Sequence, residues 1–385
     1  MVYLYWELVR YDYTFTMIKT LAIETSCDDT SVGIVTYQDG SWANPILHTY
    51  SQVTEHQEYG GVVPEIAYRV HEDTIIWLIS NIGRDEVRSC DCISVTESPW
   101  LPGSLIVGNA AASTISAQYD IPLVRVNHIH GHLLSLLLDR SDSDCPLPWL
   151  VLTVSGGHNE IYYVEDKEEG QGRRTGKKDN EEGNNWASDA DIVGTYQITR
   201  IGYSLDDAAG ESFDKVARML GGEYPGGPWI DRMAQSWVKR DDIRFKRILL
   251  DDQWLGKQQT MDNPNLLNFS FSGMKSQMHQ YLSKHPVGTL THQDICDLCR
   301  EFSECVSDIL IQKIWWAVEN YDCATIWLVG WVSANDRLFD KLESHFADLI
   351  CLRPVRKVYS TDNAAMIGVV GILTHVGEIS EVGCK

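Results

Sequence analysis

The chain has 385 residues, 44% of them hydrophobic and 22% charged, a balance typical of a globular protein that is large enough for two domains. Its formal net charge of −22 argues against tight, autonomous binding to nucleic acid, which needs clustered lysine and arginine side chains to displace counterions. No apolar run reaches the ~20 residues of a membrane span. The ten cysteines show no regular spacing, so we expect reduced thiols in a cytoplasmic protein without a membrane segment.

The first two predicted strands follow an N-terminal segment, residues 1–16, that we do not expect to belong to the fold. Residues 1–16 lack the basic start and the small-residue cleavage site of a signal peptide, and we expect a non-native or disordered extension. Residues 18–25 form an apolar run typical of a strand, and residues 31–37 alternate like a second strand. The polar turn between them suits a hairpin whose backbone amides face a phosphate.

The remaining elements alternate between helices and strands. In order, we expect a helix within 60–82, a strand at 91–96, a helix at 104–119, strands at 121–126, 149–154 and 161–164, a strand from Tyr196, and a helix that begins near Asp206. The second half opens, like the first, with a strand, a small-residue turn and another strand. This pattern predicts an α/β protein with two duplicated lobes and a nucleotide between them.

An acidic segment interrupts the second half. Residues 165–191 are rich in acidic side chains, glycine and asparagine, and they contain almost no apolar side chains. Such a composition cannot bury enough surface to offset the entropy of ordering the segment. We therefore expect a disordered insertion between two strands.

Candidate metal ligands occur in two places. His128 and His132 are four residues apart, so on a helix they project from one face, as in a two-histidine metal clamp, while His130 points elsewhere. The same spacing also fits a capped helix start, and isoleucine stands directly after the first histidine, where a zinc protease has glutamate. Cys296 and Cys299 have no second pair and lie among apolar residues at helical spacing, which favours core packing.

Seven motifs in this order and spacing are similar to those of one family. They are "LAIETSCDDTSVGIV", "HQEYGGVVPEIAYRVHEDT", "VNHIHGH", "LTVSGGHNE", "SLDDAAGESFDKVARMLGGEYPGGP", "NFSFSGMKS" and "YSTDNAAMIG", and the match covers about residues 17–370. The chain resembles the bacterial TsaD type of tRNA N6-adenosine threonylcarbamoyltransferase, formerly labelled O-sialoglycoprotein endopeptidase. The resemblance implies the sugar kinase/heat-shock/actin (ASKHA) fold, with the active site in the cleft between two actin-like lobes. These would be residues 17–133, completed by a C-terminal helix at 365–385, and residues 134–364.

The resemblance also implies a metal site. The family's ligands match His128, His132 and Asp362, a set that suits one divalent ion acting as a Lewis acid. Fe(II) is the expected ion and Zn(II) the alternative. Asp362 and Asn363 also fit a helix N-cap, and the two roles are compatible.

The resemblance further implies where the substrates bind. Asp28 and Asp29 are candidates for proton transfer or for orienting a ligand. The basic stretch Arg353, Arg356 and Lys357 is a candidate contact for tRNA, with a solvated face as the favoured alternative. Glycines after a strand allow the backbone to approach an anionic ligand closely. The residues that match the family's binding site for threonylcarbamoyl-AMP are Thr153, Val154, Ser155, Gly156, Gly157, Asp214, Gly227 and Asn335.

The implied reaction transfers the threonylcarbamoyl group of threonylcarbamoyl-AMP to N6 of the adenosine 3′ to the anticodon, in tRNAs that read ANN codons. Family members of this type work with a smaller ASKHA paralogue, the TsaB type, and with a P-loop ATPase, the TsaE type. Two other interpretations stay open: a non-catalytic ASKHA scaffold of the same complex, and a metallopeptidase. The intact His128, His132 and Asp362 argue against the scaffold, and the missing glutamate argues against the peptidase.

Two tryptophans depart from the family pattern. Where the family has "GPGL" and "GGVAAN", this chain has "SPWL", with Trp100, and "GWVSAN", with Trp331. If glycine at these positions adopts a positive φ or touches the ligand, an indole is strained there and obstructs the base. Either the pocket has reshaped around the indoles, or both residues are UGA codons in an organism that reads UGA as glycine. We favour the second explanation, and suspect Trp42 likewise.

Overall fold

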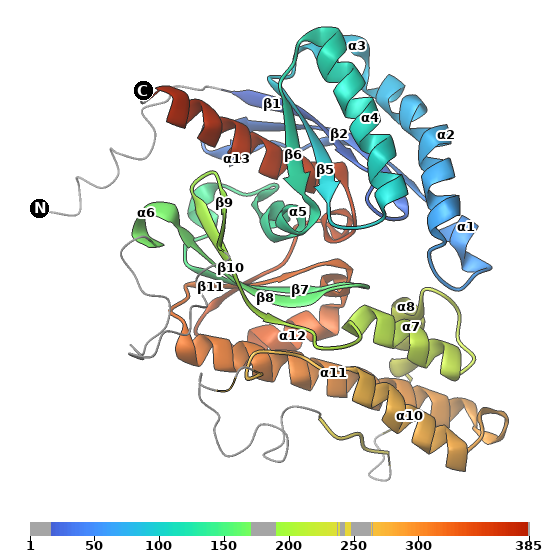
Figure 1. Cartoon of the computed structure of the whole chain (residues 1–385). Coiled ribbons are helices and arrows are strands. Elements are labelled where there is room, and N and C mark those ends of the chain that lie inside the picture. Colours follow the sequence, from blue (N-terminus) through green and yellow to red (C-terminus); the bar gives the residue numbers. More distant parts are fainter. Residues whose placement is uncertain are drawn as a thin grey trace, which may run out of the picture.

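The computed structural model describes residues 17–170, 190–236, 238, 243–247, 263 and 265–383, so the extension expected at 1–16 lies outside the described residues. The described chain forms two lobes, one above the other in Figure 1, each built on its own sheet. Within these residues, no helix combines the length and the apolar character that crossing a membrane requires.

The upper lobe contains a sheet in the order β3-β2-β1-β5-β6, with β4 also paired to β2. Its strands are β1 (Ile18–Glu24), β2 (Asp29–Gln38), β3 (Ser41–Trp42), β4 (Ile46–Ser51), β5 (Cys92–Ser98) and β6 (Leu123–Asn127). Its helices are α1 (Val53–Gln57), α2 (Pro64–Ile82), α3 (Arg84–Arg88), α4 (Pro102–Tyr119), α5 (His128–Leu134) and, returning from the end of the chain, α13 (Ala364–Gly383).

The lower lobe contains a sheet in the order β12-β11-β7-β8-β10-β9. Its strands are β7 (Trp149–Val154), β8 (Asn159–Asp166), β9 (Ala190–Val193), β10 (Tyr196–Tyr203), β11 (Thr325–Val329) and β12 (Ile350–Leu352). Its helices are α6 (Lys167–Gly170), α7 (Ala209–Met219), α8 (Gly226–Ala234), α10 (Ser272–Lys284), α11 (His292–Asn320) and α12 (Asp336–His345).

The two sheets share one topology. In each, a first strand (β1 or β7) has an antiparallel hairpin partner on one side (β2 or β8). On its other side lie two parallel strands, β5 and β6 in the upper sheet and β11 and β12 in the lower one. The predicted fold class, α/β with two duplicated actin-like lobes, is therefore confirmed.

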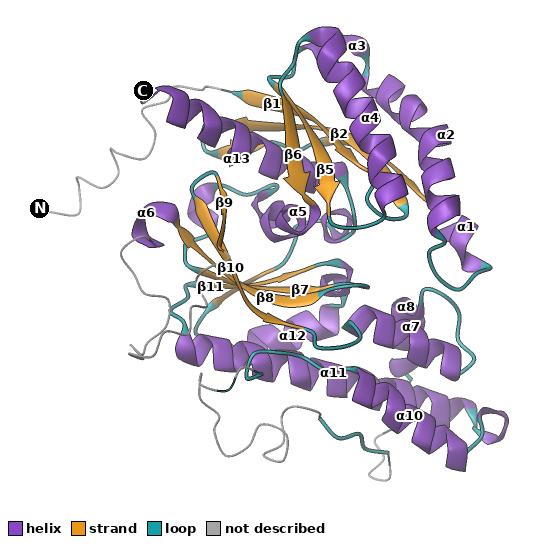
Figure 2. Ribbon diagram, in the orientation of Figure 1, coloured by secondary structure: helices purple, strands orange, loops and turns teal. Residues whose placement is uncertain are grey.

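Helices and sheets alternate in layers (Figure 2). α2 and α4 cover the outer face of the upper sheet, where Leu78 and Ala112 join a core with Ile23. α5 and α13 lie between the sheets, and Leu133 shares its core with Trp149 of β7. α7, α11 and α12 cover the outer face of the lower sheet. β1 and β7 are consequently buried on both faces, which explains their nearly continuous apolar runs.

The expected acidic insertion is ordered at both ends. Residues 165–166 belong to β8 and residues 190–191 to β9, and both pairs of residues are hydrogen-bonded to β10 instead of forming a disordered loop. Strand pairing satisfies their backbone groups, a stabilisation that composition alone does not reveal. Residues 171–189 lie outside the described residues.

The start of α7 also differs from the expectation. α7 begins at Ala209 rather than near Asp206. The Asp206 carboxylate accepts hydrogen bonds from the backbone N–H groups of Phe271, at 2.8 Å, and Ser272, at 3.2 Å. Asp206 thus stabilises the start of α10, and this long-range role explains why the helix begins later.

Two expectations about single side chains have opposite outcomes. Cys296 and Cys299 are fully buried in α11, as core packing predicts. Trp42, by contrast, lies in β3 and not in a loop, and it packs on Tyr37 with ring centroids 4.8 Å apart. Because Trp42 is buried, glycine there would leave part of the core unfilled, and the structure argues against glycine at this position.

Candidate functional site

Three side chains from distant parts of the chain meet between the lobes. His128 and His132 lie on α5, which begins directly after β6, and Asp362 precedes α13. Nε2 of His132 lies 3.1 Å from Oδ1 of Asp362, and Nε2 of His128 lies 3.5 Å from the same oxygen. One potential ligand atom from each residue lies within 4.8 Å of the other two. Two imidazoles and one carboxylate at this spacing fit a divalent ion and leave positions for further ligands.

The start of α5 sets the direction of the histidines. The Asn127 side chain accepts a hydrogen bond of 2.8 Å from the N–H of Ile129 and caps the helix. The four-residue spacing then places His128 and His132 on one face, with ring centroids 4.7 Å apart. His130 points elsewhere, as expected, because its Nε2 lies 3.1 Å from Asp191 of β9.

The sequence suggests two roles for Asp362 and Asn363, metal ligand and helix N-cap, and each residue suits one of them. Oδ1 of Asn363 accepts a hydrogen bond of 3.1 Å from the N–H of Met366 and so caps α13. Asp362 instead faces the histidines. Although burial raises its pKa, His128 and His132 lower the pKa of Asp362 to about 2. The carboxylate is therefore ionised at neutral pH and suited to a cation.

A buried carboxylate lies behind His128. Oε2 of Glu24, at the end of β1, is 3.2 Å from Nδ1 of His128. Burial raises the pKa of Glu24, but His128 lowers it by more; conversely, burial lowers the pKa of His128, but Asp362 and Glu24 raise it by more. Glu24 is not among the site residues predicted above, because in the sequence it is only the polar end of an apolar strand. Its place in the motif "LAIETSCDDTSVGIV" is the one signal in the sequence that could have pointed to it.

Asp28 and Asp29 lie beside this group. Burial, and after it the charge of Asp362, raises the pKa of Asp28 and raises the pKa of Asp29 to about 7. Oδ1 of Asp29 is buried and has no hydrogen-bond partner within the described residues. Tyr224 approaches from the lower lobe, and burial together with Asp28 raises the pKa of its hydroxyl. A carboxyl group with a pKa near 7 can accept or release a proton at neutral pH.

The lower lobe presents glycine-rich backbone to the same cleft. The turn Ser155–His158 connects β7 to β8 and is closed by a 2.9 Å hydrogen bond from the N–H of Ser155 to the carbonyl of His158. Gly210, in the first turn of α7, donates its N–H to the carbonyl of Ser155 at 3.2 Å. Thr153 and Val154 are buried at the end of β7. The predicted substrate residues 153–157 therefore run without a break from the end of β7 into the turn beside the start of α7.

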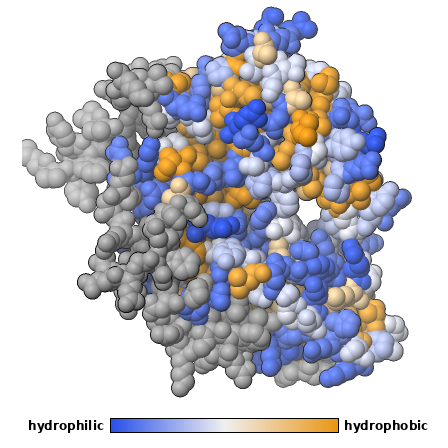
Figure 3. All heavy atoms as spheres, in the orientation of Figure 1, coloured by the Kyte–Doolittle hydropathy of each residue, from blue (hydrophilic) through white to orange (hydrophobic). Residues whose placement is uncertain are grey.

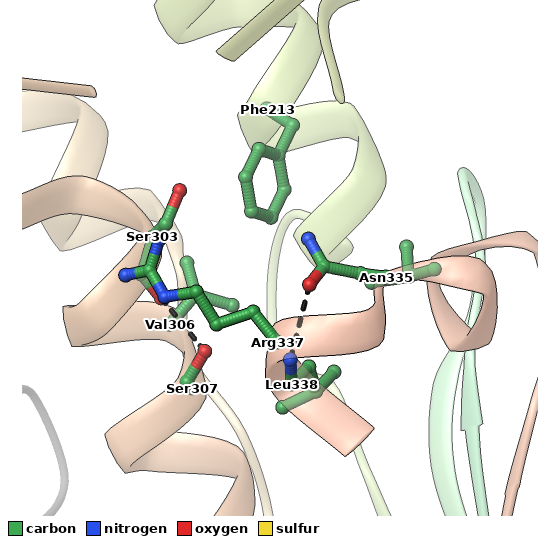
Figure 4. A pocket seen from close by; sticks show the side chains of 8 residues that line it. Phe213, Ser303, Val306, Ser307, Asn335, Arg337 and Leu338 are labelled. Atoms are coloured by element: carbon green, nitrogen blue, oxygen red, sulfur yellow. Dashed lines mark hydrogen bonds between the residues drawn. The ribbon is translucent and has the colours of Figure 1, made fainter. Parts of the chain in front are cut away.

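Asp214, Gly227 and Asn335 lie around the start of α8. Asp214 accepts a hydrogen bond of 2.6 Å from the N–H of Gly226, and burial raises the pKa of its carboxyl. Oδ1 of Asn335 accepts a hydrogen bond of 3.0 Å from the N–H of Leu338, which caps α12 (Figure 4). Asn335 also lines the small hollow drawn there. Since these polar atoms serve helix starts, their contacts with substrate stay predictions.

The basic stretch that precedes α13 is paired with acidic side chains. Arg353 lies 2.8 Å from Asp336, and Arg356 lies 2.8 Å from Asp139. Nζ of Lys357 lies 3.6 Å from Asp336 as well. These ion pairs favour the solvated face over a contact with tRNA.

Comparison with known proteins identifies a family. The family model described as "TsaD: tRNA N6-adenosine threonylcarbamoyltransferase" matches residues 46–195 and 190–369. A tRNA N6-adenosine threonylcarbamoyltransferase of Endomicrobium trichonymphae is 36% identical over 361 residues, which cover 91% of both chains. The Bacillus subtilis relative of the same name is 36% identical over 92% of this chain and 89% of its own, and that of Pelobacter propionicus is 38% identical over 91% and 90%.

A solved structure agrees in fold. The crystal structure of HypF from T. kodakarensis superimposes with a TM-score of 0.51 over 96% of this chain and 50% of its own, at 12% sequence identity. That likeness concerns the fold alone, whereas the relatives above match over nearly their whole length. The chain belongs to the tRNA N6-adenosine threonylcarbamoyltransferase family.

Proposed function

We propose that this protein transfers the threonylcarbamoyl group from threonylcarbamoyl-AMP to N6 of the adenosine 3′ to the anticodon, in tRNAs that read ANN codons. Family membership carries the proposal, since relatives 36% identical over about nine-tenths of the chain bear the name of this transferase. In the reaction, N6 forms a bond to the carbamoyl carbon and the bond from that carbon to the AMP phosphate oxygen breaks. N6 loses one proton, and AMP leaves as an anion.

One divalent ion, Fe(II) or alternatively Zn(II), is part of the proposal. His128, His132 and Asp362 would hold it, because their ligand atoms converge and Asp362 is ionised. When bound, such an ion supplies Lewis acidity toward the substrate's oxygen atoms. Glu24 orients the ring of His128, and Asn127 caps the helix that carries both histidines.

The carboxylate of Asp29 is the proposed acceptor of the proton that N6 releases. Its pKa of about 7 and its buried Oδ1, which lacks a partner within the described chain, support this role. Asp28 would orient the amine or Asp29 itself. The glycine-rich turn in the lower lobe would receive the AMP moiety, since backbone without side chains lets an anionic ligand approach closely. The proposed substrate contacts are Thr153, Val154, Ser155, Gly156, Gly157, Asp214, Gly227 and Asn335.

The proposed partners are tRNA, a smaller ASKHA paralogue of the TsaB type and a P-loop ATPase of the TsaE type, all in the cytoplasm. The net charge of −22 supports a need for partner surfaces in tRNA binding. The upper lobe carries exposed large apolar side chains, among them Ile76 and Trp77 on α2 and Ile106 on α4, and Figure 3 shows apolar surface over this lobe. Exposed apolar surface of this kind supports a protein partner.

Incubation of the protein with Fe(II), threonylcarbamoyl-AMP and unmodified ANN-decoding tRNA tests the proposal. Threonylcarbamoyl-adenosine in the nuclease digest, and its absence with His132→Ala, would support it. Absence of product with both partner proteins, from this chain and from its Trp100→Gly/Trp331→Gly variant alike, would favour the non-catalytic scaffold. Cleavage of a polypeptide substrate that depends on the same histidine would favour the metallopeptidase.

A further inference from the structure

Two indoles occupy the cleft between the lobes. Trp100 comes from the upper lobe, between β5 and α4, and Trp331 comes from the lower lobe, where Gly330 separates it from the end of β11. The ring of Trp100 lies 4.7 Å from that of His158 and 6.1 Å from that of His128, measured between centroids. A Cβ atom on Gly157 would overlap the Trp100 ring. The chain thus fills the space beside the glycine-rich turn with its own side chains.

The backbone at position 100 has a conformation that suits glycine. Trp100 has a φ of +127°, whereas the other non-glycine residues with positive φ in the described chain, Asp39, Asp120 and Asp139, have φ between 49° and 58°. Aspartate tolerates that left-handed helical region, but an L-residue at +127° crowds its Cβ against the backbone. Nε1 of Trp100 is also buried without a hydrogen-bond partner in the described residues. The indole therefore combines backbone strain with an unpaired buried donor.

The ring of Trp331 fills a slot between glycines. A Cβ atom on Gly227 would lie 2.6 Å from Cη2 of the indole, and one on Gly210 would lie 2.8 Å from Cζ2. A Cβ atom on Gly156 would lie 3.5 Å from Nε1 of the same ring. Glycines of the β7–β8 turn, of α7 and of α8 thus border one flat aromatic group. Any larger residue at positions 210 or 227 would close the slot.

A flat slot between glycine backbones suits a purine base. Indole and adenine are both fused five- and six-membered rings of similar size, so a slot that accepts one accepts the other. We propose that Trp100 and Trp331 occupy the place of the adenylate, and that the natural protein carries glycine at both positions. The identity of the nucleotide rests on the proposed function, but the strain at position 100 and the slot at position 331 do not.

Binding of AMP, measured by calorimetry, tests whether the indoles occupy the nucleotide's place. The Trp100→Gly/Trp331→Gly double variant should bind AMP about tenfold or more tightly than the chain with both tryptophans, because AMP no longer has to displace the two indole rings. Trp315→Gly is the matched control, since it removes an exposed indole from α11 and should leave AMP binding unchanged. Equal or weaker binding by the double variant overturns the proposal.

Thermal melting of single variants tests the strain at position 100, even if the double variant folds poorly. Trp100→Gly should melt at a higher temperature than Trp100→Ala, because both lose the same ring but alanine keeps the strain at a φ of +127°. At an unstrained position the order is reversed, since glycine loses more chain entropy on folding. Alanine melting at or above glycine would overturn the claim that this position is built for glycine.

The gene and the protein from the source organism provide a third test. We expect UGA at codons 100 and 331, and glycine at both positions in peptides analysed by mass spectrometry. UGG codons together with tryptophan in both peptides overturn the proposal. If the double variant binds AMP but forms no threonylcarbamoyl-adenosine with its partners present, the proposed function fails while this inference stands, because AMP binding requires no tRNA.

Discussion

Oε2 of Glu24 lies 3.2 Å from Nδ1 of His128, while the other nitrogen of the same ring faces Asp362 at 3.5 Å. Both Glu24 and His128 are buried, and the Glu24 carboxylate also accepts hydrogen bonds from the hydroxyl of Thr96 and the backbone N–H of Ser26. β5 and the turn after β1 therefore hold this carboxylate in place. A carboxylate that accepts the N–H of a metal-binding imidazole fixes the tautomer and the orientation of the ring.

Replacing Glu24 by glutamine should weaken metal binding about 10- to 100-fold. Glutamine keeps the shape of the side chain but loses the charge that favours a proton on Nδ1 of His128 and a free electron pair on Nε2. The affinity for Zn(II), measured by competition with a chelating dye, reports this effect without tRNA or adenylate. Glu165→Gln changes a buried glutamate of β8 and is the control. An equal loss of affinity in both variants would mean that Glu24 acts through folding alone.

His128→Ala, His132→Ala and Asp362→Ala should each remove bound metal and most transferase activity. Each substitution deletes one of the three atoms that converge within 4.8 Å. His130→Ala should keep both properties, because that ring faces Asp191 on β9. Metal content after dialysis, measured by mass spectrometry, and product formation would be compared across the four variants. A loss of metal from His130→Ala as complete as that from His128→Ala contradicts the ligand assignment.

Local patterns predicted most of the fold. β1 and α2 could be predicted because the spacing of apolar residues within a single element shows which side chains are buried, and so whether the element is a strand or a helix. Asp206 and the ends of the acidic segment were misjudged, since their roles depend on partners that only the folded chain brings near. Asp206 binds the start of α10, and Asp191 pairs with β10 and contacts His130.

In the candidate site too, local residue spacing predicted some features, whereas others depend on residues that are far apart in the sequence. The spacing of His128 and His132 predicted that both lie on one helix face, and the structure confirms it. Asp362 stands 230 positions beyond His132, and Glu24 stands 104 positions before His128. No local pattern joins residues so far apart; the family resemblance supplied Asp362, while Glu24 emerged only from the fold. The predicted substrate residues remain predictions until a ligand is bound.

A buried lysine offers a test of the lower lobe that is independent of the metal. Lys313, on α11, is fully buried, and its Nζ donates hydrogen bonds to the carbonyl oxygens of Asn265, at 3.3 Å, and Leu266, at 2.8 Å. Nζ also lies 4.7 Å from the ring centroid of Trp316. Burial lowers the pKa of Lys313 to about 7. The folded protein therefore releases this proton at a much lower pH than the unfolded chain does.

The difference in the free energy of unfolding between this protein and its Lys313→Met variant should consequently depend on pH. Between the folded pKa of about 7 and the ordinary lysine pKa, the unfolded state binds one more proton, so stability rises with pH by up to about 1.4 kcal/mol per pH unit. Below pH 7 both states are protonated and the contribution is constant. Methionine fills similar volume without titrating, although it removes the lysine donor from the carbonyl groups of Asn265 and Leu266. Urea unfolding of both proteins at several pH values between 6 and 10 would measure the difference. As the pH rises above 7, the free energy of unfolding of the parent protein should increase relative to that of Lys313→Met, whichever of the two is more stable at pH 6. A difference that does not change with pH across this range would mean that the carbonyl groups and Trp316 keep Lys313 charged.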